Sequence, residues 1–322
     1  MPFEELPTVP SADELVDRAF SRAARTGRAK HGVEAQRAML DVAGNVLSDN
    51  LEHVVRSWPD LDGLHPYHRA IADVVAGVDD LREHLGAVDW AAGQVTAIAA
   101  EHRSRVRGDA DLARRQRKQA FARMADVLEE VAEDLEALES ARRDLARLPG
   151  IDPEVPTVVV AGYPNVGKSS FLAAVTRARP ELATYPFTTT AVGLGHVEVH
   201  HITYQIVDTP GLLDRPAAER NDIERRAMVA LEHLADAVVV LLDPSETCGY
   251  PIERQLALRD ELADRFARAG VSVISVANKA DLPGEVEADY AMSITEGEGV
   301  EAVLVAAVEA VGYEPELPSR RE

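Results

Sequence analysis

Residues 162–170, GYPNVGKSS, follow the apolar run TVVVA and have the G-x-x-x-x-G-K-[ST] spacing of a phosphate-binding loop, or P-loop. Such a loop turns backbone N–H groups at the start of a helix toward phosphate oxygens, and the helix dipole favours the bound anion. Gly162 permits the tight turn, Lys168 is expected to reach the β- and γ-phosphates, and Ser169 is expected to bind Mg²⁺. The predicted phosphate-binding residues are Asn165, Val166, Gly167, Lys168, Ser169 and Ser170.

A second motif, DTPGLLD, follows another apolar run at residues 208–214. Asp208 is expected to hold Mg²⁺, through a water molecule, and Gly211 to present its N–H to a γ-phosphate. In well-known nucleotide switches the next residue is often a glutamine that orients the attacking water. Here it is Leu212, which can neither hold nor polarise a water molecule. The motif alone therefore leaves open whether the chain hydrolyses nucleotide or only binds it.

The segment YPFTTT, residues 185–190, lies between these two motifs. A threonine here is expected to close over Mg²⁺ and the γ-phosphate when a triphosphate is bound. Thr189 is the predicted residue, with Thr188 and Thr190 as alternatives, and each could instead be a solvated loop hydroxyl.

NKAD, residues 278–281, predicts which base is bound. The carboxylate of Asp281 can accept hydrogen bonds from guanine N1–H and from its exocyclic amine, a pair of donors that adenine does not offer. The stem of Lys279 can lie over the ring, and Asn278 can tie this loop to the phosphate-binding loop. In the following MSIT, backbone N–H groups from Ser293, Ile294 and Thr295 are candidates to donate to guanine O6. The four motifs in this order predict a site for GTP or GDP with Mg²⁺.

The elements that must position these motifs change character near residue 148. Apolar residues before it recur at helical spacing, as in the stripe from Phe121 to Leu145, with weaker breaks or close packing expected at Gly86 and Gly93. Beyond it, strand-like runs alternate with helical stretches near 168–177, 218–234 and 251–269. The sequence predicts an all-α helical bundle followed by an α/β P-loop GTPase domain, with a mostly parallel sheet and helices on both faces.

The predicted boundaries follow this change and the proline-rich stretch LPGIDPEVP. They are 1–148 for the helical domain, 149–156 for a linker, 157–312 for the GTPase domain and 313–322 for a short tail.

Composition limits the setting in which the protein works. The formal net charge is −21 and only four residues are lysine, which favours a soluble monomer in a salt-loving cytoplasm over an ordinary acidic protein. No apolar run approaches the roughly 20 residues of a membrane span, and the acidic N-terminus is unlike a signal peptide. Cys248 is the single cysteine, so an internal disulfide is excluded. We expect a cytoplasmic protein with no membrane partner.

Longer stretches of the chain resemble a known family. GYPNVGKSS, YPFTTT and DTPGLLD are similar to the Obg-related branch of GTPases. Within that branch, four stretches resemble the nucleolar GTP-binding protein family of large ribosomal subunit assembly: HPYHRAIADVV (65–75), LARLPGIDPEVPTVVVAGYPNVGKSSF (145–171), RNDIERRAMVALEHL (220–234) and DPSETCGYPIERQL (243–256). The resemblance covers about residues 50–312, and with the acidic composition it points to a short archaeal member.

This resemblance implies a GTPase that binds the large ribosomal subunit precursor and its rRNA. It also implies that a hydrophobic residue at Leu212 is a family trait, compatible with slow hydrolysis that the particle stimulates. Some relatives use K⁺, held partly by a phosphate-loop asparagine, and Asn165 matches that position. Asn165 could equally brace the loop. With Lys168, Thr189 and Gly211, it completes the predicted catalytic set.

Two basic stretches of the helical half are candidates for RNA contact, because the planar fork of arginine suits phosphate. They span residues 18–37 and 103–118. The alternative is a solvated helix face paired with nearby acids. A second functional interpretation also stays open: a nucleotide-sensing regulator that binds ribosomes or tRNA with little catalytic turnover.

Overall fold

The computed structural model describes residues 2–148, 150–176, 181–183, 192–208, 213–216 and 219–313. Its contacts divide the chain into two compact units. The helical unit comprises residues 2–64 and 75–146, and the sheet-bearing unit comprises residues 65–74 and the chain from residue 147 onward. The segment HPYHRAIADV thus groups with the sheet, whereas the boundaries at 148 and 156 stay a prediction from composition.

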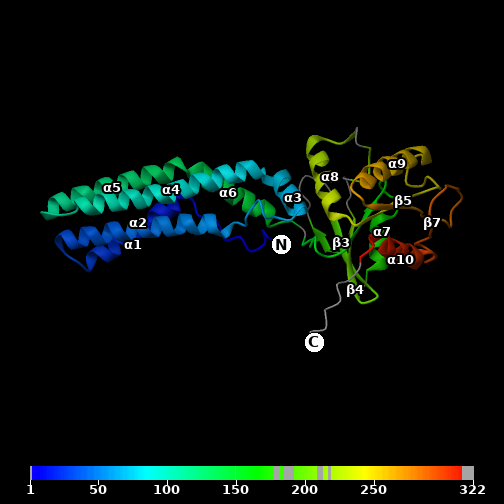
Figure 1. Ribbon diagram of the computed structural model, residues 1–322, viewed down its shortest axis with the longest axis horizontal. Coiled ribbons are helices and arrows are strands. Elements are labelled where there is room, and N and C mark those ends of the chain that lie inside the picture. The colour runs from blue at the N-terminus through cyan, green and yellow to red at the C-terminus, as the bar shows by residue number, and fades with distance from the viewer. Residues whose placement is uncertain are drawn as a thin grey trace, which may run out of the picture. The chain divides into compact units, whose positions relative to one another are not determined.

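The helical unit is built from five helices that pack along one another (Figure 1). Their bounds are Ala12–Arg28 for α1, Gly32–Ser57 for α2, Val78–Arg105 for α4, Ala110–Glu130 for α5 and Ala132–Leu145 for α6. α2 contacts α1, α4 and α5, and its Leu40, Leu47 and Leu51 are fully buried. The predicted all-α domain is confirmed.

Two details of the helical unit differ from the sequence-based expectation. Gly86 and Gly93 lie inside α4, and a Cβ added to either would meet nothing within 4 Å, so they neither break the helix nor permit close packing. The helix continues because burial of residues such as Val88 and Val95 outweighs a cost of about 1 kcal/mol per glycine. The long stripe is divided instead at Val131, between α5 and α6, where ψ changes to 15°.

The sheet-bearing unit holds seven paired strands in the order β2-β3-β4-β1-β5-β6-β7. They are Thr157–Ala161 for β1, Glu181–Ala183 for β2, Val192–Val199 for β3, Ile202–Asp208 for β4, Ala237–Leu242 for β5, Ser272–Ala277 for β6 and Tyr290–Ala291 for β7. The pairs from β4 through β7 are parallel, and the two pairs from β2 to β4 are antiparallel. This is the predicted mostly parallel sheet.

Five described helices begin in this unit, and some of them cover the two faces of the sheet. They are Pro66–Ala76 for α3, Lys168–Val175 for α7, Asp222–Leu234 for α8, Ile252–Arg268 for α9 and Val300–Val311 for α10. α9 and α10 both pack on β5 and β6, from opposite faces, and α7 joins α10 (Figure 1). α8 begins four residues later than predicted, because Asn221 and Glu224 form a capping box at its start.

Within the described part of the chain, no helix combines the length and the apolar character needed to cross a membrane.

Candidate nucleotide-binding site

The phosphate-binding loop connects β1 to α7, as its motif requires. Gly162 and Gly167 have φ of 132° and 109°, and a Cβ on Gly162 would lie 2.5 Å from the Leu241 carbonyl oxygen. A Cβ on Gly167 would collide with the side-chain amide of Asn278. Only glycine fits at either position, since both the backbone angle and the space exclude a side chain.

The side chain of Lys168 is buried at the first turn of α7. Its Nζ donates hydrogen bonds to the carbonyl oxygens of Gly162 (2.8 Å) and Tyr163 (3.0 Å), so the ammonium is curled over the loop. Burial lowers the pKa of Lys168, and the nearby Asp208 carboxylate opposes that shift. A buried cation enclosed by a loop of backbone groups is suited to an anionic ligand such as a phosphate.

Ser169 and Asp208 meet at the start of α7 and the end of β4. Ser169 Oγ donates to Asp208 Oδ2 at 2.5 Å, whereas the buried Oδ1 of the same carboxylate has no hydrogen-bond partner in the described chain. Burial raises the pKa of Asp208. A hydroxyl beside a partly unsatisfied carboxylate is a hard oxygen donor set, and these two residues fit Mg²⁺.

Asn278 and Lys279 follow β6 and approach the phosphate-binding loop from a distant part of the sequence. Asn278 Nδ2 donates to the Val166 carbonyl oxygen at 2.8 Å, although the two residues are 112 positions apart. The predicted tie between the two loops is therefore present. Lys279 has a φ of 61°, and its ammonium contacts Asp243 and Thr247 rather than solvent alone.

Asp281 is exposed and is oriented by Ser293, whose hydroxyl donates to Asp281 Oδ1 at 2.6 Å. The N–H of Ser293 donates to the Glu298 carbonyl oxygen at 2.9 Å. That N–H is therefore engaged within the protein, and a donor to a base oxygen from this segment falls to Ile294 or Thr295. The side chain of Ile294 lies close to Gly167, which joins this segment to the phosphate-binding loop.

The remaining predicted residues divide into two groups. Asn165, Ser169 and Ser170 are exposed at the loop, and Asn165 has a φ of 65°. The other predicted residues, Thr189 and Gly211, lie outside the described residues. The same holds for the alternatives Thr188 and Thr190 and for Leu212, which stands where other nucleotide switches often have glutamine.

The structure brings the two basic stretches together at one end of the helical unit. Arg37 at the start of α2 donates to the carbonyl oxygen of Val106 after α4 at 2.8 Å, and the rings of Phe20 and Phe121 stack 4.3 Å apart. The α1–α2 and α4–α5 turns accordingly lie at the same end (Figure 1). We call this the basic end; its exposed cations without an ion pair or hydrogen bond in the described residues are Arg22, Arg25, Arg28, Arg107, Arg114, Arg115 and Lys118.

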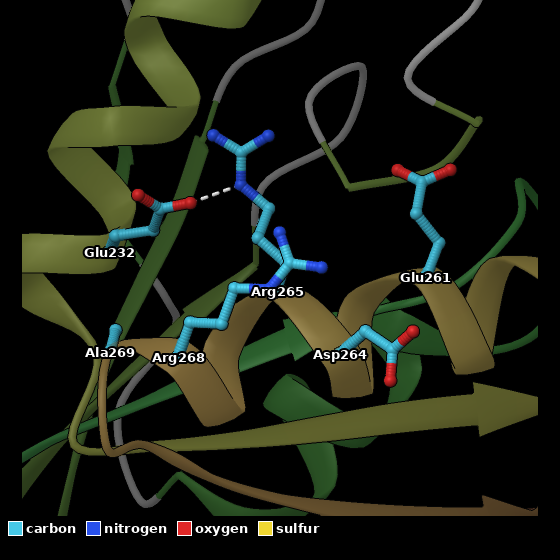
Figure 2. A pocket seen from close by; sticks show the side chains of 6 residues that line it. All are labelled: Glu232, Glu261, Asp264, Arg265, Arg268 and Ala269. Carbon is cyan, nitrogen blue, oxygen red and sulfur yellow. Dashed lines mark hydrogen bonds and ion pairs between the residues drawn. The ribbon is translucent and has the colours of Figure 1, made fainter.

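A cavity of about 510 Å³ lies between α8 and α9, away from the phosphate-binding loop. Figure 2 shows its charged lining, in which Glu232 of α8 pairs with Arg265 of α9. Glu261 on the same wall accepts a hydrogen bond from Arg220, whose side chain is fully buried. Sequence reasoning missed Arg220, because nothing in the sequence around it marks it as buried.

A second set of residues near the site was also missed. Asp243, Thr247 and Tyr250 belong to the turn after β5, and Tyr250 packs on Tyr163 of the phosphate-binding loop with ring centroids 4.5 Å apart. The stretch DPSETCGYPIERQL carries a family resemblance, but the sequence gives no sign that it reaches Lys279.

Comparisons with known proteins find similarity to one family in both the helical unit and the sheet-bearing unit. The profile of the NOG1 N-terminal helical domain matches residues 3–152, and that of Nucleolar GTP-binding protein 1 (NOG1) matches residues 222–281. An uncharacterized protein of Methanocaldococcus jannaschii is 35% identical over 295 residues, which is 88% of this chain and 82% of that one. Nucleolar GTP-binding protein 1 of Saccharomyces cerevisiae is 32% identical over 314 residues, which is 93% of this chain and 48% of the relative.

The chain thus spans about half the length of the relatives that carry this name. Among solved structures, a candidate nucleolar GTP-binding protein 1 of Plasmodium falciparum is 32% identical and covers 51% of this chain and 90% of that chain, with a TM-score of 0.45. The G domain of T. maritima FeoB is 24% identical over 48% of this chain and 98% of that chain, with a TM-score of 0.38. Because both scores are below 0.5, the fold assignment rests on the topology described above.

Proposed function

Because the chain belongs to the nucleolar GTP-binding protein 1 (NOG1) family, we propose that it binds GTP and GDP with Mg²⁺, hydrolyses GTP slowly and acts in assembly of the large ribosomal subunit. One observation supports the nucleotide part of this proposal: the hydrogen bond from Asn278 to the Val166 carbonyl oxygen joins residues 278–281, which we call the base-reading loop, to the phosphate-binding loop. In this proposal the two loops, far apart in sequence, form one nucleotide site, with the buried Lys168 at one end and the Asp281 carboxylate at the other.

At the phosphate end, Lys168 would exchange its two carbonyl contacts for β- and γ-phosphate oxygens. Ser169 and Asp208 would hold Mg²⁺, which neutralises charge on the phosphates when bound. Asp208 would bind the cation as a carboxylate, so with its raised pKa we expect Mg²⁺ binding to weaken as the pH falls. In this proposal Thr189 and Gly211 complete the phosphate end.

At the base end, Asp281 would accept the two guanine donors, and Lys279 would cover the ring. Ser293 fixes the Asp281 carboxylate in advance, which reduces the entropy lost on binding. An adenine nucleotide would leave that carboxylate without its paired donors, so it would bind weakly. Competition of GDP, ADP and inosine diphosphate against a fluorescent GDP tests this: binding of ADP as tight as GDP would contradict a guanine site.

Hydrolysis must proceed without a glutamine after Gly211, since Leu212 stands there. We propose that Asn165, exposed on the loop three residues before Lys168, helps to hold K⁺ beside the phosphates. Turnover should then be faster in KCl than in NaCl, and Asn165→Ala should remove the difference. Equal turnover in the two salts would assign Asn165 to bracing the loop.

The basic end of the helical unit supplies the proposed contact to rRNA of the large subunit precursor. Its arginines, which have no ion pair in the described residues, can donate hydrogen bonds to phosphate, although the whole chain has a net charge of −21. Arg28→Glu with Arg107→Glu should lower co-sedimentation with immature large subunits. The matched control, Arg226→Glu with Arg268→Glu, reverses two exposed arginines of the sheet-bearing unit that also have no ion pair in the described residues, and it should bind like the unaltered protein. Equal loss in both variants would reject a specific contact.

The second candidate function is a nucleotide-sensing regulator of mature ribosomes or tRNA with little turnover, and Leu212 is compatible with it. The maturation stage of the ribosomal particle that the protein binds distinguishes the two candidate functions. The assembly function predicts binding to immature rather than mature large subunits, whereas the sensing function predicts the reverse. In both, we expect a cytoplasmic monomer.

A further inference from the structure

The turn after β5 is organised around one buried carboxylate, that of Asp243. Its Oδ1 accepts hydrogen bonds from the N–H and the hydroxyl of Ser245, at 3.1 and 2.5 Å. Its Oδ2 accepts from the Thr247 hydroxyl at 3.0 Å and from the Cys248 N–H at 2.7 Å. Burial alone would raise the pKa of Asp243, but these donors and the Lys279 ammonium lower it to about 2, so the group is a carboxylate at neutral pH.

The turn contacts the base-reading loop through Lys279. Its Nζ lies 2.6 Å from Asp243 Oδ2 and 2.8 Å from Thr247 Oγ1, so two of its three N–H donors are engaged. The Lys279 backbone is left-handed, with a φ of 61°. The ammonium of Lys279 is thus held by the turn after β5, and its four-carbon stem runs from that contact back to the base-reading loop.

The turn itself is held from two other sides. Gln255 of α9 accepts from the Asp243 N–H at 2.7 Å and donates to the carbonyl oxygens of Asp243 and Tyr250 at 3.1 and 2.8 Å. The Tyr250 ring packs on Tyr163, whose carbonyl oxygen accepts from Lys168. The same turn thus contacts both the residue expected over the base and the loop expected around the phosphates.

We propose that Asp243 and Thr247 are positioning residues for guanine binding, which hold the Lys279 stem as a preformed wall for the base and so lengthen the residence of the nucleotide. The inference rests on the proposed guanine-nucleotide function. A lysine stem loses much rotamer freedom when it is immobilised, and a wall formed in advance spares that loss at the moment of binding. A missing wall should appear mainly in the dissociation rate, where most affinity differences between related complexes lie.

The test measures dissociation of fluorescent GDP from the full chain in molar KCl. We expect Asp243→Asn to speed dissociation about tenfold, because it weakens a charge-assisted hydrogen bond, and Thr247→Val to speed it about threefold. Ser245→Ala is the matched control: it removes a hydrogen bond to the same carboxylate and a 3.0 Å contact with the Thr247 hydroxyl, but no contact to Lys279, and it should change the rate less than about twofold. Equal rate increases in Ser245→Ala and Thr247→Val would show that turn stability alone is responsible.

A double-variant cycle separates positioning from a general structural effect. In a Lys279→Met background, Thr247→Val should have almost no further effect, since the ammonium that it contacts is absent. A full threefold effect in that background would overturn the proposal.

The ratio of GDP to inosine diphosphate affinity supplies a second readout. Stacking does not sense the 2-amino group, so Asp243→Asn and Thr247→Val should leave the ratio unchanged, whereas Asp281→Ala should reduce it. A changed ratio in the first two variants would contradict a stacking role. A wild-type protein with no preference for GDP would overturn the proposed guanine site, and this inference with it.

Discussion

Arg220 is expected to be the main polar anchor between the segment after DTPGLLD and α9. Its side chain is fully buried, its Nη1 donates to Glu261 Oε1 at 3.2 Å, and its Nη2 donates to the Arg215 carbonyl oxygen at 2.6 Å. Its Nε is buried without a hydrogen-bond partner in the described chain, and burial lowers the pKa of the guanidinium. The two hydrogen bonds must therefore offset the free-energy cost of burying the guanidinium charge with one of its N–H groups unpaired.

Arg220→Met keeps most of the apolar volume and removes both bonds. Each hydrogen bond to a charged group contributes about 1.5–3 kcal/mol, and the carbonyl of Arg215 is left unpaired. Part of this lost stability is regained, because methionine does not carry the desolvation cost of a buried guanidinium. In addition, Glu261 is 29% exposed and can be solvated by water once Arg220 is replaced. We expect the free energy of unfolding to fall by about 2–4 kcal/mol, measured by urea denaturation at constant KCl.

The chain offers a matched control for this substitution. Arg254 of α9 donates to Glu219 at 3.2 Å, but the two side chains are 57% and 51% exposed. Arg254→Met should cost less than about 0.5 kcal/mol, because surface ion pairs contribute little. If the two methionine variants unfold at the same urea concentration, burial of Arg220 is not what stabilises this junction.

Four further predictions follow from other parts of the chain. Gly167→Ala should weaken GDP binding at least tenfold in a fluorescence titration, because φ is 109° and the new Cβ would strike Asn278; unchanged affinity would refute the strained-loop argument. Gly86→Ala and Gly93→Ala should each raise the free energy of unfolding by about 0.5–1 kcal/mol, since the added methyl groups on α4 meet open space, and a loss of stability would contradict this. Burial lowers the pKa of His68 from 6.5 to about 4, so between these values the unfolded chain binds a proton that the folded chain does not. Stability should therefore fall as the pH drops from 7 to 5, and His68→Gln should flatten that fall; an unchanged slope would count against it. Finally, the unfolding midpoint should rise between dilute buffer and molar KCl, given the net charge of −21, and a constant midpoint would exclude adaptation to salt.

The strands and motifs of the phosphate end were predictable from sequence because their signals are local. The run TVVVA became β1 and the loop after it carried the glycines where a positive φ is needed. By contrast, β2 and β7 have three and two residues, too few to show a period of two. The fourth strand, β4, ended at Asp208 as its alternation and its motif implied.

The residues that support the site could not be predicted, since their roles depend on long-range contacts. Asp243 meets Lys279 across 36 positions, and Arg220 meets Glu261 across 41. In the sequence, an arginine that will be buried looks the same as one on the surface. The basic stretches show the same limit: only the fold shows that Arg103 and Arg105 pair with acids, whereas Arg107 has no ion pair among the residues that the structure describes.

The central claim is that the chain is a GTP-hydrolysing switch whose timing is coupled to the assembling large subunit. GTP turnover in molar KCl, with and without purified immature large subunits, tests it most directly. We predict slow turnover by the protein alone and strong stimulation by the immature particles, with Lys168→Ala inactive in both conditions. Slow turnover that immature particles leave unchanged would contradict the claim and favour the nucleotide-sensing regulator.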